Sequence, residues 1–182
     1  MRTELMRATQ DIHYALHSDP VFACLMDPQL TAHQYARALS VFAEFYGAIE
    51  CARDSQSHFQ ELSLTSECNA LSRDVGPRSG QASQFDVRGR EELLGALYVA
   101  HGAAFGRNSM RANVASQLPE LPHHFLNLPT QSNRWRSLKE NLERTGTDVL
   151  TRQRIICGAN TAFSFIARVS KLKQLDGVSA LS

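Results

Sequence analysis

Apolar residues recur along this chain with the spacing of helices almost throughout. They return every three or four positions, as on one face of a helix, and the alternation typical of strands is almost absent. The predicted helical segments are residues 4–17, 31–54, 57–74, 89–115, 132–144 and 148–174. The pattern therefore predicts an all-α bundle of six to eight helices.

Capping and breaking residues mark where these segments begin and end. Thr31 is a suitable N-cap for the second segment, and Ser18, Asp19 and Pro20 form a stop signal after the first. Residues 76–83 are rich in glycine, serine and proline, which predicts a loop. Three prolines between positions 119 and 129 leave room for at most a short helix around residues 123–128.

Length and composition restrict the class of protein. With 182 residues, the chain is expected to fold as a single domain over residues 1–182. Its net charge of +1 argues against a nucleic-acid binder, which would show a basic excess. No apolar run is long enough to span a membrane, and the N-terminus lacks a signal peptide's apolar centre. The four cysteines form no Cys-x-x-Cys pair, so we expect reduced thiols and a cytoplasmic protein.

The segment at residues 94–107 carries three glycines inside a predicted helix, at positions 95, 102 and 106. Each glycine costs about 1 kcal/mol relative to alanine in a helix, so three of them need a reason. Gly102 and Gly106 are four residues apart and therefore share a helical face. Two interpretations remain open: close packing against another helix, or close approach of the backbone to a flat ligand.

Histidine on the first segment is the candidate for chemistry. Leu5, Ile12 and Leu16 form an apolar stripe, and His13 lies at its border, where a side chain reaches either a cleft or solvent. His17 follows one turn later. Two histidines at this spacing are able to chelate a metal ion, but the pair alone is an incomplete site.

Read together, these two segments resemble the heme oxygenase family. Residues 5–16 are similar to its N-terminal helix, with the pattern Leu-(Arg)-x-x-Thr-x-x-x-His-x-x-Leu, and residues 94–107 are similar to its distal helix in bacterial members. Residues 30–50 and 159–163 resemble the second and final helices of the family. The motifs occur in the family's order along nearly the whole chain, and the biliverdin-forming bacterial members are the nearest type.

The resemblance implies a heme site, a reaction and partners. His13 would be the axial ligand of the heme iron, and Gly102 and Gly106 would shape the catalytic distal face. The cofactor-binding set that it implies is Thr9, His13, Tyr98, Gly102, Gly106, Arg107 and Phe163. Heme would be both cofactor and substrate, cleaved to biliverdin, carbon monoxide and ferrous iron. Electrons would come from a ferredoxin, a flavodoxin-like protein or a flavoprotein reductase, and a bacteriophytochrome would receive the biliverdin.

Four residues depart from the family pattern: Arg107, His101, and Ala103 and Ala104, which replace the small polar residues that commonly follow the first distal glycine. Arg107 stands where the family has a second distal glycine or alanine. Either it turns outward to a heme propionate or caps a kink, or it fills the distal pocket and weakens oxygen chemistry. His101 replaces a glutamate, and is expected to pack at the helix surface unless it ligates iron. The alternative function is a catalytically weakened module that binds heme or a partner. A non-heme di-iron enzyme is disfavoured because residues 148–174 contain no histidine.

Overall fold

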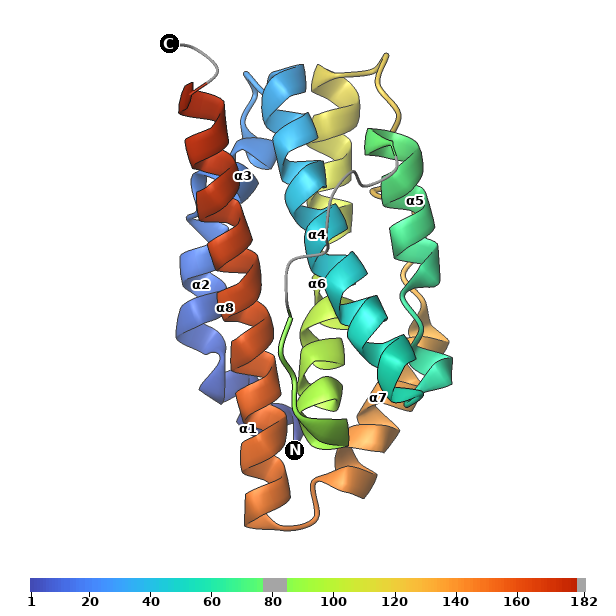
Figure 1. Ribbon diagram of the computed structural model, residues 1–182. Coiled ribbons are helices and arrows are strands. Elements are labelled where there is room, and N and C mark those ends of the chain that lie inside the picture. The colour runs from blue at the N-terminus through green and yellow to red at the C-terminus, as the bar shows by residue number, and fades with distance from the viewer. Residues whose placement is uncertain (77–84, 180–182) are drawn as a thin grey trace.

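The computed structural model describes the backbone of residues 1–76 and 85–179, with side chains up to Leu175. Every regular element in this part of the chain is helical, which confirms the all-α prediction. In chain order the elements are α1 (Arg2–Ala8), α2 (Gln10–His17), α3 (Pro20–Ala23), η1 (Cys24–Met26), α4 (Ala32–Gln56), η2 (Gln60–Leu62), α5 (Thr65–Val75), α6 (Gly89–Gln117), α7 (Ser132–Thr145) and α8 (Val149–Ser179). The described helices thus number eight, with two short 3-10 turns (Figure 1).

The four long helical segments are confirmed to within a few residues of their predicted ends. α4 begins after Thr31 because that residue forms a capping box with Gln34. The backbone N–H of Gln34 donates to the Thr31 hydroxyl at 3.3 Å, and the backbone N–H of Thr31 donates to the Gln34 side chain at 2.9 Å. Both N–H groups would otherwise lack a partner at the start of the helix.

The first and third segments differ from the prediction. The helix expected over residues 4–17 is interrupted at Thr9, where φ is −111° and ψ is 2°, so it forms α1 and α2. The Thr9 hydroxyl donates to the Leu5 carbonyl oxygen at 2.8 Å. The helix expected over residues 57–74 is replaced by η2 and α5, because Ser57 and Phe59 adopt left-handed backbone conformations that end α4.

The possible short helix around residues 123–128 is absent, and this stretch folds as turns. The Asp74 carboxylate accepts hydrogen bonds from the backbone N–H groups of His124 and Phe125, both at 2.8 Å. These N–H groups are therefore paired with α5 rather than within a helix of their own. Of the loop predicted at residues 76–83, all but Gly76 lies outside the described residues.

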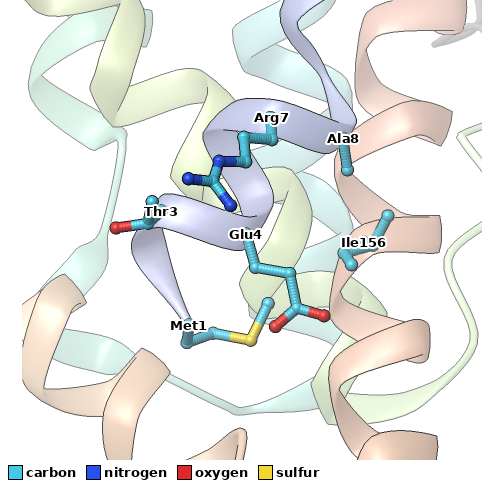
Figure 2. A pocket seen from close by; sticks show the side chains of 6 residues that line it. All are labelled: Met1, Thr3, Glu4, Arg7, Ala8 and Ile156. Atoms are coloured by element: carbon cyan, nitrogen blue, oxygen red, sulfur yellow. The ribbon is translucent and has the colours of Figure 1, made fainter.

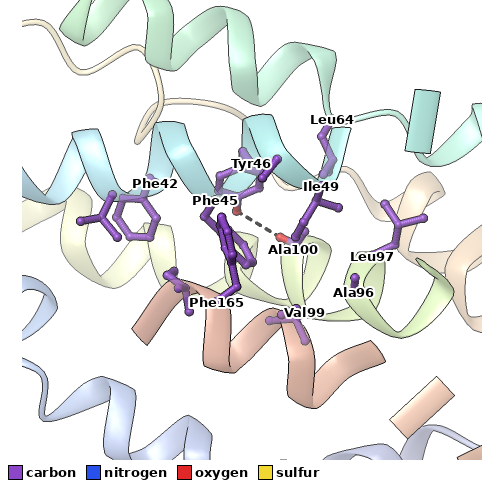
Figure 3. Close-up of a cluster of buried hydrophobic side chains, with 14 of the residues drawn as sticks. Phe42, Phe45, Tyr46, Ile49, Leu64, Ala96, Leu97, Val99, Ala100 and Phe165 are labelled. Atoms are coloured by element: carbon purple, nitrogen blue, oxygen red, sulfur yellow. Dashed lines mark hydrogen bonds between the residues drawn. The ribbon is translucent and has the colours of Figure 1, made fainter. Parts of the chain in front are cut away.

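Three long helices, α4, α6 and α8, form the centre of the bundle (Figure 1). α1, α2 and α3 lie along one side of α8, and α5 and α7 lie on the other side of the bundle. The core between α4, α6 and α8 is built largely from aromatic and aliphatic side chains, among them Phe45, Tyr46, Ile49 and Phe165 (Figure 3). None of the described helices is long and apolar enough to cross a membrane.

α6 and α8 make the most extensive contact between any two described helices, and glycine makes it possible. A Cβ atom at Gly95 would overlap the carbonyl oxygen of Ile155 and lie 2.7 Å from the backbone nitrogen of Ala159. A Cβ atom at Gly158 would likewise overlap the carbonyl oxygen of Glu92. The two backbones therefore touch directly, and close packing is the role of Gly95.

Candidate functional site

Gly102 and Gly106 have surroundings unlike those of Gly95, although all three share one face of α6. They follow Gly95 by seven and eleven residues, which is about two and three helical turns. A Cβ atom at either position would meet no atom within 4 Å. The face of α6 that touches α8 at Gly95 is therefore uncovered at Gly102 and Gly106. We call this uncovered stretch the open face of α6.

His13 of α2 contacts α8 close to the place where α6 touches that helix. Phe163 lies one turn beyond Ala159, which contacts α6, and its side chain is buried. The edge of one ring meets the face of the other between His13 and Phe163, with 5.9 Å between their centroids. α2 therefore contacts α8 one turn beyond the point where α6 and α8 touch, and the open face of α6 begins two turns beyond that point along α6.

The His13 side chain is available as a neutral ligand. Much of the residue is exposed while one side of the ring packs against Phe163 of α8, and within the described part of the chain its ring nitrogens make no hydrogen bond. Burial of the ring against α8, together with the charge of His17 at 4.5 Å between ring centroids, lowers its pKa. The imidazole therefore keeps an unprotonated nitrogen at neutral pH, as metal binding requires.

Thr9 and Tyr98 lie near this region in different settings. Thr9 is buried, and its hydroxyl is engaged with the Leu5 carbonyl, which fixes the junction where α2 begins. Tyr98 is half-buried and stacks on Trp135 of α7, with 5.9 Å between ring centroids and 30° between ring planes. Burial raises the pKa of Tyr98. Contacts of either residue with heme stay predictions.

The expectation that Arg107 turns outward is wrong. Only 2% of its side chain is exposed, and its Nη1 lies 3.9 Å from a carboxylate oxygen of Glu67 on α5. The guanidinium sits over the ring of Phe125, 5.0 Å from its centroid. Arg107 is rotated about 140° from Gly102 around the helix, so it does not fill the space at the open face either.

His101 also points into the bundle, contrary to the expected position at the helix surface. It is buried, and its Nε2 lies 3.0 Å from the carbonyl oxygen of Leu62 in η2. The neutral ring donates this hydrogen bond, and burial lowers its pKa. A ring held in this way faces η2, so His101 does not offer a second ligand at the open face.

Comparison with known proteins finds similarity in the fold of this chain but not in its sequence. No protein-family model and no curated protein matches the sequence. The structure is similar to that of the heme oxygenase from Neisseria meningitidis, solved with NO and CO bound. The TM-score is 0.70 with 18% sequence identity, over 94% of this chain and 90% of that one. The chain has the heme oxygenase fold.

The sequence analysis did not identify Glu67, which lies between two arginines in this heme oxygenase fold. It is buried, with one carboxylate oxygen facing Arg107 and the other 3.3 Å from Arg134 of α7. A signal was present in the sequence. Leu64, just before α5, and Glu67 and Leu71 within it are spaced as on one helical stripe, and an acidic residue within an apolar stripe needs a buried partner.

Two surface hollows lie elsewhere on the bundle. Figure 2 shows the first, which opens between α1 and α8. It is lined by Met1, Thr3, Glu4, Arg7, Ala8 and Ile156. The second follows the outer side of α8, where Asn160, Thr161 and Ser164 line it. Neither includes His13 or the glycines of the open face. In the chain as described, no three His, Cys, Asp or Glu side chains gather as a metal site.

The buried His101 makes a prediction about pH. Its pKa is lowered in the folded protein, so an unfolded chain takes up a proton there more readily. We expect the free energy of unfolding to fall as the pH is lowered through about 6.5, the ordinary histidine value. In His101→Gln this fall should be shallower, which urea titrations at several pH values would measure. An unchanged slope would show that His101 does not contribute to it.

Proposed function

We propose that this chain is a heme oxygenase that binds heme between α2 and the open face of α6. The observation that carries the proposal is the contrast among the glycines of α6. Gly95 is used for helix packing, whereas a Cβ atom at Gly102 or Gly106 would meet no atom within 4 Å. Packing does not account for the cost of two glycines in the middle of a long helix, but a flat ligand lying on the backbone does.

The side chains present fit heme. One neutral imidazole is the usual protein ligand on the iron of a heme, since the porphyrin supplies four further nitrogens. His13 offers such a nitrogen, and Phe163 limits how its ring tilts. The fold, which is that of a heme oxygenase, adds support from the arrangement of the whole bundle.

Each part of the site has a task in this proposal. Heme, when bound, supplies the iron that activates oxygen and the ring that is opened to biliverdin. His13 would hold the iron from the α2 side. Gly102 and Gly106 would let the α6 backbone lie close to the opposite face of the ring and keep bulky side chains from it. The bare backbone would leave room for a small molecule such as oxygen on that face.

The alternative is a protein that binds heme without cleaving it. Its sequence argument is three departures from the family pattern: Arg107, which would block the distal pocket, and Ala103 and Ala104, which replace small polar residues. Arg107 points to Glu67, which removes its part of that argument, whereas Ala103 and Ala104 still favour this alternative. The reaction also requires electrons, so a ferredoxin, a flavodoxin-like protein or a flavoprotein reductase belongs to the proposal. A cytoplasmic location and a bacteriophytochrome that receives biliverdin stay predictions.

A spectroscopic assay tests the proposal. Hemin added to the purified protein should give a saturable Soret band. Addition of ascorbate under air should then remove this band while the absorbance of biliverdin grows, and the same mixture under argon should stay unchanged. A stable band under air would favour the carrier. Failure to bind hemin would contradict both functions.

A further inference from the structure

The open face leaves α6 without side-chain packing on one side of its glycine-bearing turns, so these turns must be held from the opposite side. Two hydrogen bonds do this before Gly102. The Tyr46 hydroxyl donates to the carbonyl oxygen of Ala100 at 3.1 Å (Figure 3). His101 bonds to Leu62 at 3.0 Å. Both contacts precede the glycines and leave the following turns to another anchor.

Arg107 provides that anchor, directly after Gly106. Its guanidinium is buried between Glu67 and the ring of Phe125. Its Nε and Nη1 have no hydrogen-bond partner in the part of the chain that the structure describes. These two atoms are therefore held by the charge of Glu67 and by the aromatic ring, while the guanidinium also interacts with the Tyr46 hydroxyl. A buried cation is costly away from its counter-charge, so α6 is favoured in the position that keeps Arg107 beside Glu67.

Glu67 is itself fixed in place by α7. Arg134 Nη1 lies 3.3 Å from the second oxygen of Glu67, and Arg134 Nη2 donates to the Ser66 hydroxyl at 3.0 Å. The carboxylate thus bridges two arginines, one on α6 and one on α7. Arg134 orients the Glu67 carboxylate, and the ion pair of Arg107 with that carboxylate links its position to α6.

We propose that Arg107, acting through Glu67, is a positioning residue that holds the glycine-bearing turns of α6 and so sets where the open face stands relative to His13. Its effect on heme cleavage rests on the proposed function. Its effect on α6 itself does not, and is measurable in the protein without heme.

Three variants separate this role from general stability. Arg107→Met keeps the volume and removes the charge, Arg107→Lys keeps the charge with a shorter reach, and Arg134→Met removes the other cation that meets Glu67. In hydrogen–deuterium exchange of the ligand-free protein, Arg107→Met should speed exchange of residues 100–110 about tenfold or more. Arg107→Lys should give an intermediate rate. Arg134→Met leaves the Glu67 carboxylate beside Arg107 but less firmly oriented, so it should speed these amides by only about threefold or less.

The hemin complex provides the second measurement. Arg107→Met should slow single-turnover heme breakdown about tenfold while the hemin Kd changes less than about threefold, and Arg107→Lys should recover part of the rate. Unchanged exchange in Arg107→Met, or equal effects of Arg107→Met and Arg134→Met, would overturn the proposal. If Arg107→Met does not fold, unchanged exchange in Arg107→Lys would overturn it instead. A wild-type protein that binds no hemin would overturn the proposed function, and the exchange data would still decide the anchoring of α6.

Discussion

Gly95→Ala should lower the free energy of unfolding by about 3 kcal/mol, the upper end of the usual cost of overpacking a core. The added methyl group would overlap the Ile155 carbonyl and press on the nitrogen of Ala159. Both are backbone atoms of α8 and have no rotamer to change, so α6 and α8 must move apart along their contact. Urea denaturation followed by circular dichroism at 222 nm would measure the loss.

Gly102→Ala is the matched control on the same face of the same helix. Its methyl group would meet no atom within 4 Å, so the higher helix propensity of alanine should raise the stability of the ligand-free protein by up to about 1 kcal/mol. The same methyl group would occupy space proposed for heme, and hemin breakdown should slow. Equal destabilisation by both substitutions would contradict the assignment of Gly95 to packing and Gly102 to an open face.

His13→Ala should abolish hemin breakdown and remove the histidine signature from the spectrum of the ferric complex. The iron would lose its protein ligand, while the apolar contacts of the porphyrin with the bundle would remain. We therefore expect weaker binding, with a Kd raised about tenfold or more, rather than no binding at all. Electron paramagnetic resonance and the Soret position of the ferric complex would show the change of ligand.

His17→Ala is the control for this experiment, because the two rings lie 4.5 Å apart on α2. It should preserve the spectrum and most of the turnover. It should also let the pKa of His13 rise, since His17 is one of the two causes that lower it. If His17→Ala removes the histidine signature and His13→Ala does not, the axial ligand is His17 and the present assignment is wrong.

The periodicity of the sequence was sufficient to predict the long helices, because their ends depend on local signals. α4 begins after Thr31 because the side chains of Thr31 and Gln34, three residues apart, cap the helix. The break at Thr9 lacked such a signal, since no glycine or proline stands there and the apolar stripe runs through it. The turns around Phe125 depend on Asp74, about fifty residues earlier, so no local pattern predicted them.

The sequence was sufficient to predict which residue types form the site, but not which way their side chains point or which of them are covered by a neighbouring helix. The sequence places Gly95, Gly102 and Gly106 on one face, yet only the path of α8 decides which of them is packed and which is open. Arg107 raised the question of a blocked pocket because its partner was unknown. That partner, Glu67, lies on another helix, and only the assembled bundle brings the two charges together.

The contact of Gly95 with α8 is also the fixed point about which α6 would tilt; we call it the pivot. Gly106 lies about 16 Å along the axis of α6 from this pivot, at 1.5 Å per residue. A tilt of α6 by about 5° would therefore move Gly106 by about 1.4 Å, enough to change contact with a flat ligand, while the pivot itself hardly moves. Substitutions of Gly95 should therefore change the distance between the open face of α6 and a bound flat ligand, although Gly95 lies two to three turns away from that face.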